Sequence, residues 1–322
     1  MRVLITGVTG FVGSHLAKEL VDKGHDVFGV TKFSTSRDTK SLNQYLQDVT
    51  LLTCDIADNH SVTNTLKTAD MDAVIHLAAL SPVRDSFEKP FSYIQTNVVG
   101  TLNIAHALMN LPDADKRKMI YASTAEVYGI QKVKPINEDA QLNPSSPYSN
   151  TKAMTDMYLR MLSSTYGFNV TVMRCTNTYG RKLDASFYIE YVLTTMLKKQ
   201  KVYIGAPESE RDYMYVADHV NAYVKALENF DVKGEAFNAG TGDGISNKDL
   251  AYKIADMVGY DKKNIILGKY PPNYPVRPLI SDQPFIILDS AKIQKKLGWK
   301  PTIPLDKGLE ITAEYWKGKM KA

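Results

Sequence analysis

The feature that most constrains the fold is a short stretch with three glycines near the amino terminus, Gly7-Val-Thr-Gly10-Phe-Val-Gly13. It lies between a strand-like apolar run, Val3–Thr6, and a helix-like segment, Val12–Lys23. In a strand–turn–helix unit the first glycine permits the tight turn, and the second lets backbone amides approach a pyrophosphate. The third lets the helix pack close to the strand, and the helix N-terminus adds a positive dipole end. The stretch therefore predicts a dinucleotide-binding site.

Strand-like and helix-like segments alternate through the first half of the chain. Further strands are expected at Asp26–Val30, Leu51–Cys54, Ala73–Leu77, Lys118–Ser123 and Asn169–Arg174, and helices at His60–Thr68, Tyr93–Met109 and Tyr148–Tyr166. Apolar, β-branched strands that alternate with helices indicate a parallel sheet covered on both faces. We therefore expect an α/β fold with a doubly wound parallel (Rossmann) sheet, which binds ligands at the carboxyl ends of its strands.

The pattern changes after Asn177. A loop and the helix-like segment Ser186–Lys199 follow, and residues 259–285 are rich in proline and tyrosine. Between them, Val216–Leu227 and Ala236–Ala239 are typical of a return to the sheet domain. We expect a smaller, discontinuous C-terminal substrate lobe, with substrate bound between the lobes. The predicted dinucleotide-binding domain comprises residues 1–177 with about 216–245, and the predicted substrate-binding lobe comprises residues 178–215 and 246–322.

The composition limits the kinds of ligand and the cellular setting that fit this chain. The 322 residues carry a net charge of +4 with both signs interspersed, which is too mild for nucleic acid but suits an anionic small substrate. No apolar run approaches the ~20 residues of a membrane span. Cys54 and Cys175 lie in strand-like runs without metal-ligand spacing, so we expect buried, reduced thiols, no metal site and a cytoplasmic setting.

The end of the second predicted strand bears on the cofactor. An acidic residue there usually holds the ribose 2′-hydroxyl of NAD, but this strand ends in Thr31 and Lys32, with Arg37 nearby. These side chains suit a 2′-phosphate and favour NADP over NAD, with solvated Lys32 and Arg37 as the alternative. Asp55 follows the third strand and is placed to meet the adenine amine. Further cofactor contacts are predicted at Thr9, Phe11, Val12, Ile56, Leu77, Ala78, Ala79, Asn97 and Ser123, and a substrate contact at Ser81.

Tyr148 and Lys152 open a predicted helix four residues apart, so they share a helix face. The lysine ammonium can stabilise the phenolate and lower a phenol pKa that starts near ~10. Such a tyrosine can take a proton from a sugar hydroxyl while hydride leaves for the nicotinamide. A pair at this spacing is common on surface helices. Together with the glycine loop and the next motif, it predicts redox catalysis, and both residues are also expected to contact the cofactor.

The next motif, Tyr121-Ala-Ser-Thr-Ala-Glu-Val-Tyr-Gly129, follows the fifth predicted strand. Thr124 can donate to the sugar hydroxyl that is oxidised. Simple epimerisation at C4 needs no carboxylate here, whereas elimination of water across C5–C6 needs a base for the C5 proton, and Glu126 can provide it. The alternative for Glu126 is a solvated carboxylate at a strand end, or one that holds a loop amide.

Taken together, these residues resemble the extended short-chain dehydrogenase/reductase family of nucleotide-sugar epimerases and dehydratases, over nearly the whole chain. The resemblance rests on the glycine loop, on Thr124–Tyr148–Lys152, and on Asn177-Thr-Tyr-Gly-Arg181, Arg211-Asp-Tyr213, Val216, Asp218, Arg277-Pro278 and Leu297-Gly-Trp-Lys-Pro301. It implies that Asn177 and Arg211 contact the substrate and that Arg277 contacts the nucleotide diphosphate. An arginine fork suits that geometry. Relatives commonly form a dimer through the two helices that correspond to Tyr93–Met109 and Tyr148–Tyr166, which implies a homodimer here. For Met154, Met157 and Met161 in those helices, core packing is the ordinary interpretation.

Within the family, Ser123-Thr124-Ala125-Glu126 is similar to the Thr-x-Glu signature of 4,6-dehydratases, and the end of the second strand is similar to that of NADP-using GDP-mannose 4,6-dehydratases. Two observations qualify this. Ala125 stands where dTDP-glucose dehydratases carry an aspartate acid and GDP-mannose dehydratases a serine. Nucleotide-sugar decarboxylases show a similar run.

The sequence therefore predicts an NADP- or NAD-dependent nucleotide-sugar 4,6-dehydratase. In this hypothesis Tyr148 removes the C4 hydroxyl proton with Thr124 bridging, and Glu126 takes the C5 proton. Water leaves from C6, and the stored hydride returns to C6. The alternatives are a 4-epimerase, a UDP-glucuronate-type decarboxylase, and a non-catalytic dinucleotide-sensing regulator, a class that typically loses the Tyr/Lys pair.

Overall fold

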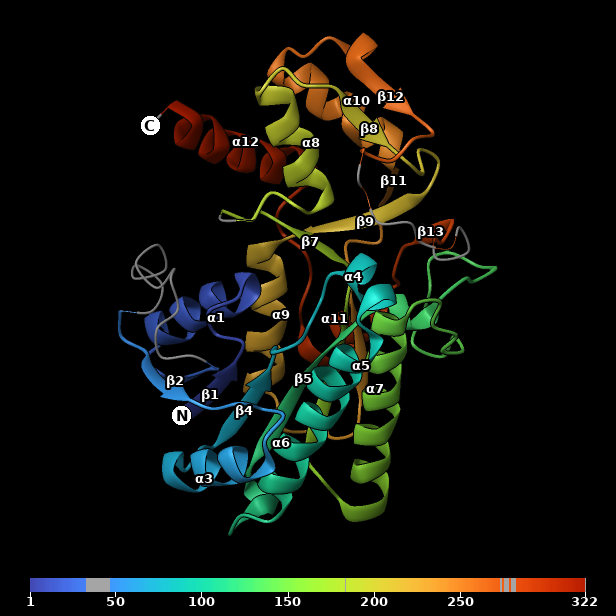
Figure 1. Ribbon diagram of the computed structural model, residues 1–322. Helices are drawn as coiled ribbons and strands as arrows, with labels where there is room; N and C mark the ends of the chain where they lie inside the picture. Colours follow the sequence, from blue (N-terminus) through green and yellow to red (C-terminus); the bar gives the residue numbers. More distant parts are fainter. Residues whose placement is uncertain (33–46, 183, 273, 275–277, 279–281, 322) are drawn as a thin grey trace.

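The computed structural model describes the chain except for residues 33–46, 183, 273, 275–277, 279–281 and 322 (Figure 1). Two residues with predicted binding roles, Arg37 and Arg277, therefore lie outside the described residues.

The larger part of the molecule is built on a seven-stranded sheet with the order β10-β6-β5-β4-β1-β2-β3, in which every neighbouring pair is parallel. Its strands are β1 (Arg2–Thr6), β2 (Asp26–Thr31), β3 (Thr50–Thr53), β4 (Ala73–His76), β5 (Lys118–Thr124), β6 (Val170–Cys175) and β10 (Ala236–Ala239). Successive side chains of a strand point to opposite faces. In β1, Val3 and Ile5 accordingly join one hydrophobic cluster and Leu4 the other. The apolar strands are therefore covered on both faces, and the predicted doubly wound α/β fold is confirmed.

Helices cover the two faces of this sheet (Figure 1). Helices α1 (Phe11–Asp22) and α9 (Val216–Glu228) pack together on one face, and α3 (Asn59–Ala69), α6 (Gly100–Met109) and α7 (Pro147–Tyr166) lie on the other. The start of α7 is fixed by a capping box between Ser146 and Ser149, and its end by Gly167, which has a φ of 71°. This cap sets the register of the helix that carries Tyr148 and Lys152.

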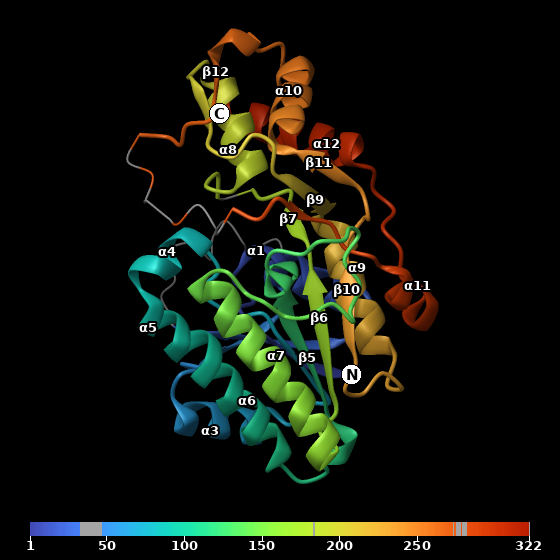
Figure 2. The same ribbon diagram turned by 90° about the vertical axis from the view of Figure 1, so that its right-hand side faces the viewer.

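A second group of elements lies over the carboxyl ends of the central strands (Figures 1 and 2). It has its own core, which includes Tyr179, Leu193, Ile254 and Trp316. Its strands form a four-stranded sheet of β7 (Asn177–Tyr179), β9 (Glu210–Tyr215), β11 (Gly244–Ser246) and β13 (Phe285–Ile286), and a pair of β8 (Val202–Ile204) with β12 (Ile265–Leu267). Its helices are α8 (Tyr188–Leu197), α10 (Asn247–Val258) and α12 (Leu305–Lys321). The residue boundaries between the two lobes stay a prediction.

The remaining elements are short: α4 (Val83–Glu88), α5 (Pro90–Tyr93), α11 (Ala291–Leu297), the π-helix η1 (Ile94–Val99), and the 3-10 helices η2 (Ala114–Lys116), η3 (Ala125–Tyr128) and η4 (Lys262–Asn264). The segment that we expected to be one helix over Tyr93–Met109 is therefore interrupted by a π-helical stretch. Within that stretch, the Asn97 side chain bonds to the Leu80 backbone and to Thr151. Among the described residues, no helix is both long and apolar enough to cross a membrane.

Candidate active site

A cavity of about 1230 Å³ lies where the carboxyl ends of the central strands meet the second lobe. Pockets for a single small ligand usually measure roughly 300–1,000 Å³, so this cavity has room for more than one such molecule. The loops that follow β1 to β6 form one wall, and segments of the second lobe form the other. This position agrees with the rule that doubly wound sheets bind ligands at the carboxyl ends of their strands.

The glycine loop lies at one end of the cavity, and two of its positions have no space for a side chain. At Gly7, where φ is +72°, a Cβ would lie 2.8 Å from the Ala78 nitrogen. At Gly13, a Cβ would lie 2.2 Å from the Gly7 oxygen. Gly10 is the N-cap of α1 and offers no side-chain cap, so the first-turn amides of α1 are left for another acceptor. This cradle fits the pyrophosphate of a dinucleotide.

The structure brings most of the predicted cofactor residues to the cavity wall. Those that line it are Gly7, Thr9, Gly10, Phe11, Val12, Gly13, Thr31, Lys32, Asp55, Ile56, Leu77, Ala78, Ala79, Ser123, Tyr148 and Lys152. Asn97 is not among the lining residues, and its predicted contact with the cofactor stays a prediction. Its buried amide accepts from the Leu80 nitrogen at 2.9 Å and donates to the Leu80 oxygen at 3.1 Å, so it shapes the loop after β4.

Lys32 and Asp55 form an ion pair, with the ammonium nitrogen 2.9 Å from a carboxylate oxygen. The hydrogen bond from Lys32 lowers the pKa of Asp55. Sequence reasoning assigned these residues separately, one to a 2′-phosphate and one to adenine. The structure instead places a carboxylate next to the lysine at the tip of β2.

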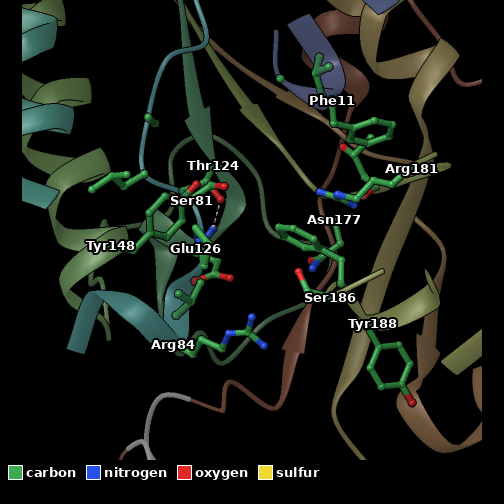
Figure 3. Close-up of a pocket in the computed structure, with 18 of the residues that line it drawn as sticks. Phe11, Ser81, Arg84, Thr124, Glu126, Tyr148, Asn177, Arg181, Ser186 and Tyr188 are labelled. Carbon is green, nitrogen blue, oxygen red and sulfur yellow. Dashed lines mark hydrogen bonds between the residues drawn. The ribbon is translucent and has the colours of Figure 1, made fainter. Parts of the chain in front are cut away.

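Three residues with predicted catalytic roles come together from three elements (Figure 3). Thr124 ends β5, Glu126 lies in η3, and Tyr148 stands in the first turn of α7. The Thr124 hydroxyl accepts a hydrogen bond from the Glu126 nitrogen at 3.3 Å and also bonds to Tyr148. All three side chains line the cavity, and Figure 3 shows them side by side. The arrangement joins a phenol, a hydroxyl and a carboxylate in one pocket.

Lys152 has a different local partner from the one we expected. It is 3% exposed, and its ammonium donates to the Ala122 oxygen at 2.8 Å. Burial lowers the pKa of Lys152 to about 7. Burial also raises the pKa of Tyr148, the Glu126 carboxylate raises it further, and the bond from Thr124 opposes them. The expected lowering of the phenol pKa is therefore outweighed here by the partial burial of Tyr148 and by the nearby Glu126 carboxylate.

A buried ion pair behind these residues was missed in the sequence. Arg174 of β6 binds Asp156 of α7 through two bonds of 2.8 and 2.9 Å, and both side chains are almost fully buried. The Ser123 hydroxyl donates to the same carboxylate, and Arg174 donates to the Tyr128 hydroxyl. The signal was available, because an arginine inside the apolar strand Val-Thr-Val-Met-Arg-Cys has to find a buried partner.

On the substrate side, Ser81, Asn177 and Arg211 line the cavity. The Arg211 guanidinium donates to the Glu210 and Gln283 carbonyls at 2.8 and 2.9 Å. Sequence reasoning gave no role to the cations Arg84 and Arg181 or to a group of aromatic side chains in this wall. The aromatic group comprises Phe187, Tyr188, Tyr191, Tyr203, Tyr213, Tyr270 and Tyr274. The proline- and tyrosine-rich segment at 259–285 contains only Tyr270 and Tyr274 of this group, and Tyr213 lies in the Arg211-Asp-Tyr213 motif.

Comparison with known proteins agrees with this geometry. The family model described as GDP-mannose 4,6 dehydratase matches residues 4–312. A UDP-glucose 4-epimerase of Lactobacillus helveticus is 31% identical over 94% of this chain and 92% of its own. A dTDP-glucose 4,6-dehydratase of Salmonella typhimurium is 29% identical over 98% of this chain and 92% of its own.

Solved structures similar to this chain also include both 4-epimerases and 4,6-dehydratases. The UDP-glucose 4-epimerase of Thermotoga maritima with UDP-glucose has a TM-score of 0.87 at 31% identity, over 99% of this chain and 100% of that one. The dTDP-glucose 4,6-dehydratase of Streptomyces venezuelae with NAD bound has a TM-score of 0.88 at 26% identity, over 100% of this chain and 98% of that one.

The fold and the cavity define a protein of the doubly wound, dinucleotide-binding class. Within that class, the chain belongs to the extended short-chain dehydrogenase/reductase family of nucleotide-sugar epimerases and dehydratases.

Proposed function

We propose that this chain is an NAD(P)-dependent nucleotide-sugar 4,6-dehydratase. The observation that carries the proposal is the position of Glu126, which lines the same cavity as Thr124 and Tyr148. Transient oxidation at C4 requires only a base for the hydroxyl proton. Elimination across C5–C6 requires a second base close to the first, and Glu126 supplies that group.

The residues present fit a nicotinamide dinucleotide. The glycine loop and the first turn of α1 would hold its pyrophosphate, Asp55 its adenine, and Ala78 and Ala79 would lie beneath it. When bound, this cofactor accepts a hydride, returns it, and carries a positive charge on its oxidised ring. That charge favours the phenolate form of Tyr148, which burial alone disfavours.

The chain's own residues move the protons. Tyr148 takes the proton of the C4 hydroxyl, with the Thr124 hydroxyl as the bridge between them. Lys152, in its ammonium form, stabilises the negative charge that develops on the phenol. The resulting C4 carbonyl acidifies the C5 proton, which Glu126 removes. Protonated Glu126 then gives a proton to the departing C6 hydroxyl, which leaves as water, and C5 regains a proton from solvent when hydride returns to C6. Lys152 is buried, and the cavity walls partly bury Thr124, Glu126 and Tyr148, so the electrostatic interactions among these groups are stronger than they would be in water.

A 4-epimerase is the second candidate, and one observation favours it. Ala125, buried beside Thr124, provides only a methyl group and no acid for the departing C6 hydroxyl. Relatives named UDP-glucose 4-epimerase are as similar to the chain as those named dTDP-glucose 4,6-dehydratase. In an epimerase, Tyr148 and Thr124 would keep their roles and Glu126 would have no proton to remove.

The two candidates differ in their products. We expect the purified protein, incubated with UDP-, dTDP- and GDP-hexoses and either dinucleotide, to form a 4-keto-6-deoxy sugar nucleotide. NMR spectroscopy of the product mixture shows this directly, because the C6 methyl group gives a doublet that no substrate has. A C4 epimer without a 6-deoxy product would contradict the dehydratase proposal, and a pentose product would favour decarboxylation.

Lys32 supports NADP as the favoured dinucleotide, with NAD, which solved relatives bind, as the alternative. Its ammonium would meet a 2′-phosphate, although Asp55 shares its charge. We expect NADPH to bind more tightly than NADH, and Lys32→Gln to weaken NADPH binding by roughly tenfold while leaving NADH unchanged. Fluorescence titration of each cofactor measures this. Tighter binding of NADH to the unaltered protein would contradict the assignment.

We also propose a homodimer formed through α6 and α7, which run side by side (Figure 2). Met154, Met157 and Met161 are 43%, 53% and 39% exposed, so the expectation of core packing was wrong. They share one face of α7, at spacings of three and four residues. We expect Met157→Arg to convert a dimer to a monomer in analytical ultracentrifugation, and Lys262→Met, far from this face, to have no effect. A monomeric unaltered protein would contradict the proposal.

A further inference from the structure

A stack of three side chains connects the glycine loop to the second lobe. The guanidinium carbon of Arg181 lies 4.5 Å from the ring centroid of Phe11 and 3.5 Å from that of Phe187. Phe11 is the first residue of α1, directly after Gly10, and Phe187 is the N-cap of α8. All three side chains line the cavity, and Figure 3 shows Arg181 against Phe11. A cation held between two rings is attracted to both of them.

Residues of the second lobe contact both the side chain and the backbone of Arg181. The Arg181 side chain donates to the Thr178 carbonyl, and its backbone nitrogen donates to the Glu190 carboxylate at 2.9 Å. The other Glu190 oxygen is buried, has no hydrogen-bond partner among the described residues, and lies 3.9 Å from Nη1 of Arg181. The Arg181 carbonyl accepts from the Trp316 indole at 3.1 Å. Arg181 is therefore held by residues of the second lobe, and the face of its guanidinium meets Phe11.

The contact between Arg181 and Phe11 links the second lobe to the proposed pyrophosphate site. Its backbone belongs to the first turn of α1, the turn whose amides face the proposed pyrophosphate site. On the other side of the stack, Phe187 is flanked by Ser186 and Tyr188, which line the substrate half of the cavity. A ligand that orders the glycine loop thus also orders the surface on which the cation rests. Because Arg181 is nearly removed from water, its attraction to the rings is stronger than that of an exposed cation.

We propose that Arg181 is a positioning residue that couples dinucleotide binding to nucleotide-sugar binding through Phe11 and Phe187. The inference rests on the proposed function, because it takes the two ligands from it. A dinucleotide bound at the glycine loop fixes the position of Phe11, and the Phe11 ring in turn fixes the Arg181 guanidinium. Through its contact with Phe187, Arg181 then positions the start of α8 against the nucleotide sugar. Coupling of this kind is reciprocal, so each ligand must tighten the binding of the other by the same factor.

The test is a set of calorimetric binding constants. The probes are NADPH or NADH, whichever binds more tightly, and the tightest of UDP, dTDP and GDP. Each is measured with the other absent and then at saturation. We expect the unaltered protein to bind each ligand roughly five- to tenfold more tightly when the other is present. In Arg181→Met and Phe11→Leu this factor should fall close to one, and the double variant should be no worse than either single variant.

Two controls separate coupling from folding. Arg181→Lys keeps a charge beside Glu190 but loses the planar face, so it should fold and still show reduced coupling. Lys262→Met removes a surface cation near Tyr252 and should leave the coupling factor unchanged. Variants that melt at lower temperature but keep the full factor would overturn the inference, as would the absence of coupling in the unaltered protein. A C4-epimer product with intact coupling would overturn only the dehydratase proposal.

Discussion

Replacing Tyr148 with phenylalanine is expected to lower kcat by about 10²–10⁴-fold, the range that a positioned acid–base group contributes. The substitution removes the phenol that takes the C4 hydroxyl proton and leaves the ring in place. That ring lies edge-on to Tyr93, with centroids 6.4 Å apart, so packing is preserved. Because the phenol acts on the transition state more than on bound substrate, KM should change much less than kcat.

Tyr93→Phe is the matched control, because it removes a neighbouring phenol of the same size. The Tyr93 hydroxyl donates to the Pro82 carbonyl at 2.6 Å and does not line the cavity. Steady-state kinetics of both variants should give a large loss for Tyr148→Phe and less than about a threefold loss for Tyr93→Phe. Equal losses, or near-normal turnover in Tyr148→Phe, would contradict the assigned role.

The second large effect is expected on stability. Arg174→Met should lower the free energy of unfolding by about 3–5 kcal/mol, because it leaves the buried Asp156 carboxylate without its charged partner. The Ser123 hydroxyl then remains as a neutral donor to that carboxylate. Asp156 lies on α7 four residues after Lys152, and its ion pair with Arg174 joins that helix to β6. Loss of the pair should therefore also disturb the position of Lys152.

Denaturant unfolding measures the effect, with two comparisons. The double variant Asp156→Leu/Arg174→Met removes both charges and should recover part of the loss. Lys253→Met breaks an exposed ion pair in which Lys253 Nζ lies 2.6 Å from an Asp306 carboxylate oxygen. This substitution should lower the free energy of unfolding by at most about 1 kcal/mol. A loss in Arg174→Met no larger than that in Lys253→Met would show that the buried pair contributes little.

Local patterns were enough to predict the central sheet and the cradle of the proposed cofactor. The need for glycine at Gly13 is local, because a Cβ there would meet the Gly7 oxygen, whereas the near-contact at Gly7 is with Ala78 after β4. The apolar sequences of the inner strands predicted their burial on both faces, whereas the edge strand β3 is mostly exposed. Thr124 and Tyr148 were predicted to meet because strand ends in a parallel sheet gather at one edge.

Features that depend on contacts across the chain could not be predicted in this way. Asn97 lies in a helix-like segment, and only its packing against Leu80 shows that its amide is occupied. The direction of the Lys152 ammonium depends on the Ala122 carbonyl thirty residues earlier. The stack on Arg181 joins residues that are 170 positions apart in sequence. Amphipathic periodicity also cannot distinguish a core methionine from one on an outer apolar face, as at Met157.

The most direct test of the dehydratase account is the deuterium content at C5 of the product formed in deuterated water. If Glu126 removes the C5 proton, solvent deuterium should enter C5 of a 4-keto-6-deoxy sugar, and Glu126→Gln should abolish this product while the cofactor is still reduced. A 6-deoxy product that retains its original C5 hydrogen would contradict the role of Glu126. A C4 epimer without solvent deuterium would contradict the assignment as a dehydratase.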